Sequence, residues 1–156
     1  MNRLYNLVAV IDAAGENLLF CLRRRPPYQG LYNFVGGKIE PGEEHLRAAY
    51  RELREETGIP EDAIGLVKVM CLEYPMEDCR MEVYAGRLNR PVEPVAELNE
   101  LAWLPVGQDY ADVSRFAGVG NLGHIVQYIR AYTDLLDGKE KFLPSRRAET
   151  GASDSR

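Results

Sequence analysis

The sequence predicts one domain of mixed α and β structure. Its 156 residues allow a single hydrophobic core, and a chain of this length buries about two-thirds of its unfolded surface. Short apolar runs typical of strands occur in both halves of the chain, and two longer segments repeat apolar residues at helical spacing. This order of strands, a helix, more strands and a last helix is compatible with a sheet covered on both sides, although the pattern alone predicts only mixed α and β structure.

The first third of the chain consists of predicted strands and one loop. Apolar runs predict strands over residues 4–11 and 18–22, with turn residues between them. A loop is expected over residues 23–30, because consecutive prolines and a glycine interrupt the strand pattern. Alternating side chains predict a third strand over residues 31–35, which the next two glycines terminate.

A helix is predicted from about Glu44 to Thr57. Its apolar residues recur at the spacing of a buried stripe, namely Leu46, Ala49, Tyr50 and Leu53. The residue after this segment, Gly58, is the expected C-terminal cap.

The second half of the chain carries weaker patterns of the same kinds. Strands are predicted over residues 64–72, 81–88 and 101–104. A second helix is expected to begin after the glycine-rich residues 118–121 and to end at Gly138. We expect the domain to span residues 1–143 and residues 144–156 to form a disordered tail, because the tail has nothing apolar to bury.

The composition excludes several classes of protein. With 19 basic and 24 acidic residues the net charge is −5, so no overall field would attract a nucleic acid polymer or an anionic membrane. No apolar run is long enough to span a bilayer, and the N-terminus lacks a signal-peptide cleavage site, so we expect a soluble cytoplasmic protein. Cys21, Cys71 and Cys79 lack metal-site spacing and lie in apolar runs, so buried reduced thiols are expected.

One segment, which we call the box, carries the strongest functional signal. Residues 37–59 read GKIEPGEEHLRAAYRELREETGI and fit the pattern G-x5-E-x7-R-E-U-x-E-E-x-G-U, where U is aliphatic. This pattern is the signature of the Nudix hydrolases, and the chain resembles that family without a departure at any signature position. The resemblance implies an α/β/α sandwich on a mixed sheet and metal-dependent hydrolysis of a phosphoanhydride bond in a nucleoside diphosphate derivative.

Three glutamates of the box suit a metal ion. On a helix Glu52, Glu55 and Glu56 fall on one side, which we call the acidic ridge, beside the apolar stripe and toward solvent. Like charges this close destabilise a helix unless they share a cation, and such hard oxygen ligands suit Mg²⁺ or Mn²⁺. The alternative is a solvated glutamate face that binds no metal.

The resemblance also assigns roles to other residues of the box. It implies that the Gly37 carbonyl binds metal together with the acidic ridge and that Arg51 holds the catalytic glutamates in place. Glu43 lies near the helix start, where a carboxylate is favoured, and we expect it to support the site. Lys38 is a candidate phosphate contact, with an ordinary exposed lysine as the alternative.

A general base must accept the proton of the attacking water. In many members of the family this base is a glutamate in a loop before a late strand, and Glu97 and Glu100 lie just ahead of Trp103. Glu97 is the preferred candidate, and Glu56 is the alternative inside the box.

Residues outside the box bear on the substrate. Arg23 and Asn33 match positions that reach the base in the Nudix subset that hydrolyses unwanted nucleoside triphosphates. Asn121 matches a base-reading asparagine of the same subset, although a helix N-cap is an equal alternative. Pro75 instead resembles a diagnostic proline of the ADP-ribose pyrophosphatases.

The leading prediction is a Mg²⁺-dependent enzyme that converts a nucleoside triphosphate, oxidised or not, to monophosphate and pyrophosphate. One alternative keeps the chemistry and takes ADP-ribose, another nucleoside diphosphate sugar or a dinucleoside polyphosphate. The other is a module that senses nucleotides without hydrolysis, for which an eroded box is expected. The predicted partner is a small nucleotide, and the oligomeric state stays open.

Overall fold

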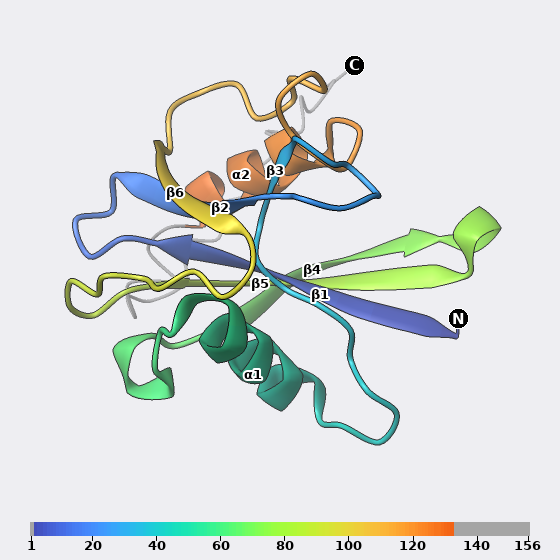
Figure 1. The fold of residues 1–156 in the computed structure, drawn as a ribbon, viewed down its shortest axis with the longest axis horizontal. Coiled ribbons are helices and arrows are strands. Elements are labelled where there is room, and N and C mark those ends of the chain that lie inside the picture. Colours follow the sequence, from blue (N-terminus) through green and yellow to red (C-terminus); the bar gives the residue numbers. More distant parts are fainter. Residues whose placement is uncertain (1, 133–156) are drawn as a thin grey trace, which may run out of the picture.

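Residues 2–132, the part of the chain that the computed structural model describes, form six strands and two α-helices (Figure 1). The strands are β1 (Arg3–Ile11), β2 (Asn17–Leu22), β3 (Tyr32–Asn33), β4 (Val67–Tyr74), β5 (Cys79–Arg87) and β6 (Glu100–Pro105). The helices are α1 (His45–Thr57) and α2 (Asn121–Ala131), and short 3-10 turns are η1 (Glu61–Ala63) and η2 (Pro75–Glu77). No helix within this part of the chain is long and apolar enough to cross a membrane.

The centre of the sheet is a parallel pair of strands that are distant in the sequence. β1 and β5 pair from Arg3↔Cys79 to Ile11↔Arg87, and β4 pairs antiparallel with β5 on the outside. β2 pairs with β1 only at Ile11↔Leu18, and then pairs along its whole length with β6. The strand order β3-β2-β1-β5-β4, with β6 on β2, makes the mixed sheet that was predicted.

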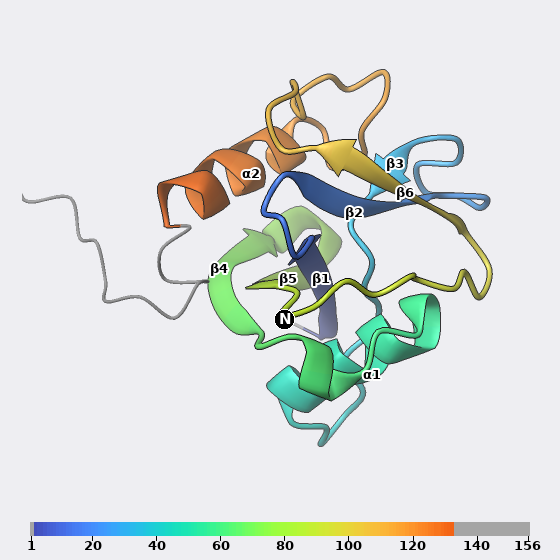
Figure 2. The same cartoon turned by 90° about the vertical axis from the view of Figure 1, so that its left-hand side faces the viewer.

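One helix covers each face of this sheet (Figure 2). Leu7 and Ala9 of β1 share a buried cluster with Ile125 of α2. Val8, the residue between them, belongs to a second cluster with Leu53 of α1. This alternation follows from the period of two along a strand, and it confirms the predicted α/β/α arrangement.

The α1 helix begins and ends where the sequence indicates, within one residue. Glu44 is its N-cap, and the Glu44 carboxylate accepts hydrogen bonds from the amides of Leu46 and Arg47, each at 3.1 Å. Gly58 ends it in the left-handed region, with φ of 69°. The predicted stripe packs inward, and Leu53 is completely buried.

The structure differs from the predictions at the edges of the sheet. β3 is shorter than residues 31–35, because Val35 leaves β2 and accepts a hydrogen bond from the amide of Val8 at 2.7 Å. The predicted burial of Cys71 is wrong, since β4 is an edge strand and this thiol is exposed, whereas the free thiols of Cys21 and Cys79 are buried. The predicted helix beyond Tyr132 and the predicted tail over 144–156 lie outside the described residues.

A buried carboxylate joins α1 to β4 and β5, a contact that the sequence did not reveal. Glu82 of β5 has a side chain that is 1% exposed, and it lies 3.0 Å from His45 Nδ1 and 3.1 Å from Lys68 Nζ. The Tyr84 hydroxyl donates to Glu82 at 2.8 Å. Burial acts to raise the pKa of Glu82, but hydrogen bonds from these three partners outweigh it and leave the pKa below its ordinary value.

Replacing Glu82 with glutamine is therefore expected to lower the free energy of unfolding at pH 7 by about 1–3 kcal/mol. A lowered folded-state pKa adds stability above the ordinary carboxyl pKa of about 4.3, and this stability is lost as the pH falls through the folded value. Urea unfolding should be measured between pH 7 and pH 3. As the pH falls, the free energy of unfolding should decrease more steeply for the unaltered protein than for Glu82→Gln. Exposed Glu73 on β4 provides the control, Glu73→Gln. Parallel pH curves for Glu82→Gln and the unaltered protein would contradict the assignment.

Candidate active site

The acidic ridge of α1 lies against the glycine loop between β3 and α1. The Gly36 amide donates to Glu56 Oε2 at 3.0 Å. A Cβ added to Gly37 would lie 2.4 Å from the carboxyl carbon of Glu52, so the Gly37 backbone and this carboxylate are immediate neighbours. The absence of a side chain at residue 37 is what allows this close approach.

Arg51 connects four groups of the box. Its guanidinium forms a two-pronged contact with Glu43, at 2.7 and 3.0 Å, and donates to Glu52 at 2.9 Å and Glu55 at 3.2 Å. It also donates to the carbonyl of Lys38 at 3.1 Å. The hydrogen bonds from Arg51 lower the pKa of Glu43 to about 2, and the same contacts raise the pKa of Arg51 further above its already high value. Arg51 therefore fixes both the glutamates and the start of the loop.

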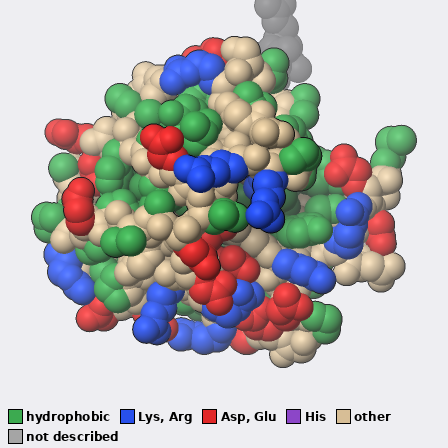
Figure 3. All heavy atoms as spheres, viewed as in Figure 1, with side chains coloured by type: hydrophobic (Ala, Val, Ile, Leu, Met, Phe, Trp, Pro, Cys, Tyr) green, Lys and Arg blue, Asp and Glu red, His purple; other side chains and the backbone are tan. Residues whose placement is uncertain are grey.

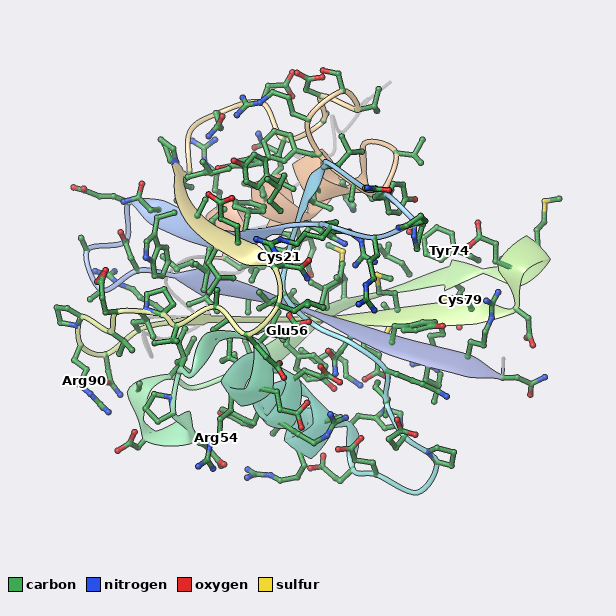
Figure 4. The ribbon with its side chains drawn as sticks, in the orientation of Figure 1. Cys21, Arg54, Glu56, Tyr74, Cys79 and Arg90 are labelled. Atoms are coloured by element: carbon green, nitrogen blue, oxygen red, sulfur yellow. The ribbon has the colours of Figure 1, made fainter. Side chains whose placement is uncertain are left out.

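Glu56 does not lie on the solvent side of α1 as predicted. Glu55 is exposed, whereas Glu56 is only partly exposed, because one residue along the helix turns it by about 100° toward the stripe and the sheet. Burial raises the pKa of Glu56 to about 7, and the nearby charges of Glu52 and Glu97 act in the same direction. Burial also raises the pKa of Glu52. Figure 4 shows Glu56 in the centre of the molecule, between α1 and Cys21 of β2.

Of the two candidate bases, only Glu97 lies beside the box. A smaller cavity of about 370 Å³ is lined by Glu56 and Glu97, with Cys21, Leu98, Asn99 and Leu101. Glu100 is the first residue of β6, pairs with Leu22, and does not line this cavity. The loop between β5 and β6 thus brings Glu97 to the cavity that Glu56 lines, whereas Glu100, at the start of β6, lies outside this cavity.

The three substrate-binding candidates from outside the box meet in one place. Arg23, Asn33 and Asn121 all line a larger cavity of about 430 Å³, and so do the glycines Gly36 and Gly37 at the box. Its apolar wall includes Leu7, Phe34, Leu72, Met81, Leu122 and Ile125. Acidic side chains gather near the centre of the face shown in Figure 3, with basic side chains above and beside them. Lys38 is exposed and is not part of the lining, so the structure does not bring it to the other candidates.

The structure gives Arg23, Asn33 and Asn121 hydrogen bonds that the sequence did not predict. Arg23 Nε donates to the carbonyl of Pro27 at 2.7 Å, and Asn33 Oδ1 accepts from the amide of Phe34 at 2.9 Å. The N-cap of α2 is Gly120, and no side chain caps this helix, so the N-cap alternative for Asn121 is wrong. Asn121 instead donates to a tyrosine, Tyr74, that the sequence did not single out.

A divalent cation fits the donor set of the ridge. Within residues 2–132 no three carboxylate, imidazole or thiol groups already converge closely enough to hold a metal ion. Arg51 donates a hydrogen bond to one carboxylate oxygen of Glu52 and to one of Glu55. Among the described residues, the other oxygen of each carboxylate accepts no hydrogen bond. These oxygens, Glu56 and the Gly37 carbonyl are hard donors of the kind that Mg²⁺ and Mn²⁺ prefer. A cation would also offset the cost of crowding partly buried like charges.

Comparison with known families decides the assignment. The family model described as the NUDIX domain matches residues 1–114. The chain belongs to the Nudix family. An oxidized purine nucleoside triphosphate hydrolase of Danio rerio is 30% identical over 118 residues, which cover 71% of this chain and 74% of that protein. A CTP pyrophosphohydrolase of Escherichia coli is 43% identical over 53 residues, so this chain spans only 39% of that relative's length and the match covers 34% of this chain.

Solved Nudix structures share the fold at low sequence identity. An Ap4A hydrolase complex from C. elegans superposes with a TM-score of 0.67 at 19% identity, and the match covers 87% of this chain and 98% of that chain. A MutT structure from work on Aliivibrio salmonicida and Vibrio cholerae has a TM-score of 0.63 at 19% identity, covering 83% and 98%. The predicted Nudix fold and hydrolase class are therefore confirmed, and these neighbours do not choose among substrates.

Proposed function

We propose that this Nudix hydrolase converts a nucleoside triphosphate to a nucleoside monophosphate and pyrophosphate. One observation carries the proposal: Arg23, Asn33 and Asn121, which are distant in sequence, line the same cavity as Gly36 and Gly37. An apolar cavity with a few polar groups suits a nucleobase, and the adjoining box suits the phosphates. The name of the Danio rerio relative points the same way, because that protein hydrolyses oxidised purine nucleoside triphosphates.

The proposed metal ligands are Glu52, Glu55, Glu56 and the Gly37 carbonyl. A related fold, from Francisella tularensis, was solved with AMP and a Mn ion, with a TM-score of 0.67 and 20% identity over 84% of this chain and 42% of that chain. When bound, Mg²⁺ or Mn²⁺ would polarise a phosphoryl oxygen, lower the pKa of a bound water and neutralise the leaving group. The oxygen-only donor set described above is the feature of this chain that supports such an ion.

The residues of the chain would carry the remaining steps. The water oxygen forms a bond to phosphorus, the bridging P–O bond of the anhydride breaks, and the pyrophosphate leaves with the electron pair. Glu97 would accept the proton of the water, because it lines a cavity together with Glu56. Arg51 would keep the ridge in position through its contacts to Glu52 and Glu55.

The two candidate bases give a direct test of this proton transfer. Glu97→Gln is expected to lower kcat by about 10²–10⁴-fold, because glutamine cannot accept the proton. Glu100→Gln is expected to stay within about twofold, because Glu100 is exposed on β6 and away from the cavity. Steady-state release of pyrophosphate measures both. If both Glu97→Gln and Glu100→Gln have the kcat of the unaltered protein, Glu56 becomes the candidate for the general base.

The substrate is tested with a panel of candidate molecules. The protein would be incubated with Mg²⁺ and, separately, with ordinary and oxidised nucleoside triphosphates, ADP-ribose and dinucleoside polyphosphates, with Glu55→Gln as the inactive control. Triphosphate turnover to monophosphate and pyrophosphate supports the proposal. Exclusive turnover of ADP-ribose or of a dinucleoside polyphosphate would contradict the proposed substrate but would still agree with hydrolysis of a phosphoanhydride bond. Nucleotide binding by calorimetry without cleavage of any phosphoanhydride would favour a sensing module.

A further inference from the structure

One polar residue in the centre of the sheet lacks a full set of partners. Asn6 of β1 is 1% exposed, and with Thr57 and Glu82 it makes up the buried polar and charged residues of the described part of the chain. The Asn6 Oδ1 accepts a hydrogen bond from the Gly37 amide at 3.0 Å. The Asn6 Nδ2 is also buried, and among the described residues this nitrogen has no hydrogen-bond partner. The side-chain amide of Asn6 is therefore paired on one side only.

The packing of β1 does not require an asparagine at this position. Asn6 shares a face of the strand with Val8 and Val10, because side chains along a strand alternate with a period of two. Both valines belong to the apolar cluster that packs against α1. An apolar side chain would continue this pattern, whereas burying an NH₂ group without an acceptor is unfavourable. Positions at which the local pattern is broken at such a cost are typical of functional sites.

The neighbouring buried carboxylate does not account for the asparagine. Glu82 lies opposite Asn6 in the parallel register of β1 and β5. The Glu82 oxygens contact His45, Lys68 and Tyr84, and the Asn6 Nδ2 bonds to neither oxygen. Asn6 is therefore not part of the network that holds Glu82.

Asn6 instead holds both peptide groups of Gly37. The Asn6 side chain accepts from the Gly37 amide, and the Asn6 backbone amide donates to the Gly37 carbonyl at 2.8 Å. Glycine has more freedom in φ and ψ than other residues, so these two contacts prevent rotations that the chain itself would allow. A backbone carbonyl oxygen has two lone pairs, and the Asn6 amide occupies one of them. The direction of the other lone pair depends on how this peptide group is held.

We propose that Asn6 is a positioning residue whose side chain directs the Gly37 carbonyl toward a cation on the acidic ridge. This inference rests on the metal ligands proposed above. It adds a residue of β1, 31 positions before Gly37 in the sequence, to a site whose other members come from the box and from the loop before β6. Asn6 acts through Gly37, in the way that residues outside a metal's own ligands orient those ligands.

Replacing Asn6 with leucine is expected to weaken metal binding more than it weakens the fold. Leucine has a similar size, and it removes the acceptor for the Gly37 amide but also removes the unpaired NH₂ group and adds apolar contacts beside Val8. These effects oppose each other, so the melting temperature of the metal-free protein should change by less than about 4 °C. The Gly37 peptide groups would be less well held, and replacing such an orienting residue typically costs about 10–100-fold in metal affinity.

The test is a titration of the metal-free protein with Mn²⁺, in which the electron paramagnetic resonance signal of free Mn²⁺ gives the dissociation constant without any substrate. The Kd of Asn6→Leu should be about 10–100-fold higher than that of the unaltered protein. Hydrogen exchange of the Gly37 amide should be faster in this variant, because its acceptor is gone. Turnover should recover toward the unaltered value as the Mn²⁺ concentration rises, because the ridge carboxylates remain.

Asn17→Leu is the matched control. Asn17 is the first residue of β2, outside the proposed site, and its Nδ2 donates to Asp12 at 2.7 Å. Because this amide is paired, its loss should lower the melting temperature, and the Kd for Mn²⁺ should stay unchanged. This is the opposite of the result expected for Asn6→Leu.

The outcomes separate this inference from the function beneath it. Equal Kd values for Mn²⁺ in Asn6→Leu and in the unaltered protein would overturn the inference alone. So would a loss of turnover that excess Mn²⁺ does not reverse, which is the result expected of a general defect in the fold. An unaltered protein that binds no Mn²⁺ would overturn the proposed metal site itself. Should Asn6→Leu fail to fold, Asn6→Ser decides in the same way, because serine adds no bulk and its hydroxyl lies one bond closer to the backbone than the Asn6 Oδ1.

Discussion

Replacing Glu56 with glutamine is expected to lower kcat by about 10²–10³-fold, the loss typical when one charged or hydrogen-bonding group of a transition-state site is removed. The amide oxygen of glutamine can still accept the hydrogen bond that Gly36 donates to Glu56. The negative charge required by a cation is lost. Because this charge is partly buried, its removal should not lower the thermal stability of the metal-free protein. Steady-state kinetics with Mg²⁺ and thermal unfolding without metal measure the two quantities separately.

Glu16→Gln is the control for this substitution. Glu16 is exposed in the turn between β1 and β2 and lines neither cavity. Glu16→Gln also removes one carboxylate, but at a position away from the proposed site. Unchanged turnover in both Glu55→Gln and Glu56→Gln would refute the assignment of the acidic ridge as the metal site.

Arg51→Lys is expected to lower kcat by about 10–100-fold and also to lower the melting temperature. Lysine keeps the positive charge but loses the planar fork, so it cannot hold Glu43 with two hydrogen bonds while reaching Glu52 and Glu55. The ridge would then be less well fixed, and small displacements of catalytic groups are costly for rate. Kinetics and thermal unfolding of the same preparation measure both effects.

The chain offers a matched control on the same helix. Arg54 is exposed and Figure 4 shows it directed away from Glu56 and the sheet, so Arg54→Lys should leave both activity and melting temperature near those of the unaltered protein. Equal behaviour of Arg51→Lys and Arg54→Lys would show that the contacts of Arg51 carry no positioning role.

The parts of the fold that follow from local pattern could be predicted well. The stripe around Leu53 and the glycine at residue 58 define α1 within one residue, because helix periodicity and capping are local properties. The parallel pairing of β1 with β5 could not be deduced, since it joins residues more than seventy positions apart, such as Arg3 and Cys79. Likewise the burial of Cys71 was mispredicted because β-rich composition does not indicate which strand lies at an edge.

In the site, too, residues placed by local pattern could be predicted, and residues placed by contacts distant in sequence could not. The box glutamates could be located because their spacing is fixed within one helix. The sequence favoured Glu97 over Glu100 as the base but could not place either residue, because the path of the loop before β6, which brings Glu97 to the cavity that Glu56 lines, depends on contacts distant in sequence. Tyr74 gave no signal of its own, because its partner Asn121 lies 47 positions away. The neighbouring Pro75 was the one local feature that could have drawn attention to it.

The two adjacent glycines of the loop have different consequences for any mutational scan of this enzyme. A Cβ on Gly36 would lie 2.2 Å from the backbone oxygen of Asn6, in the middle of the sheet, and nothing there can move aside cheaply. A Cβ on Gly37 would meet the end of the Glu52 side chain, which can rotate away. In cells, Gly36→Ala should therefore reduce the amount of folded protein. Gly37→Ala should leave abundance nearly intact and reduce turnover per molecule. A measurement of total activity in an extract would not distinguish the two variants, and only a paired measurement of protein abundance and turnover rate would separate a loss of fold from a loss of catalysis.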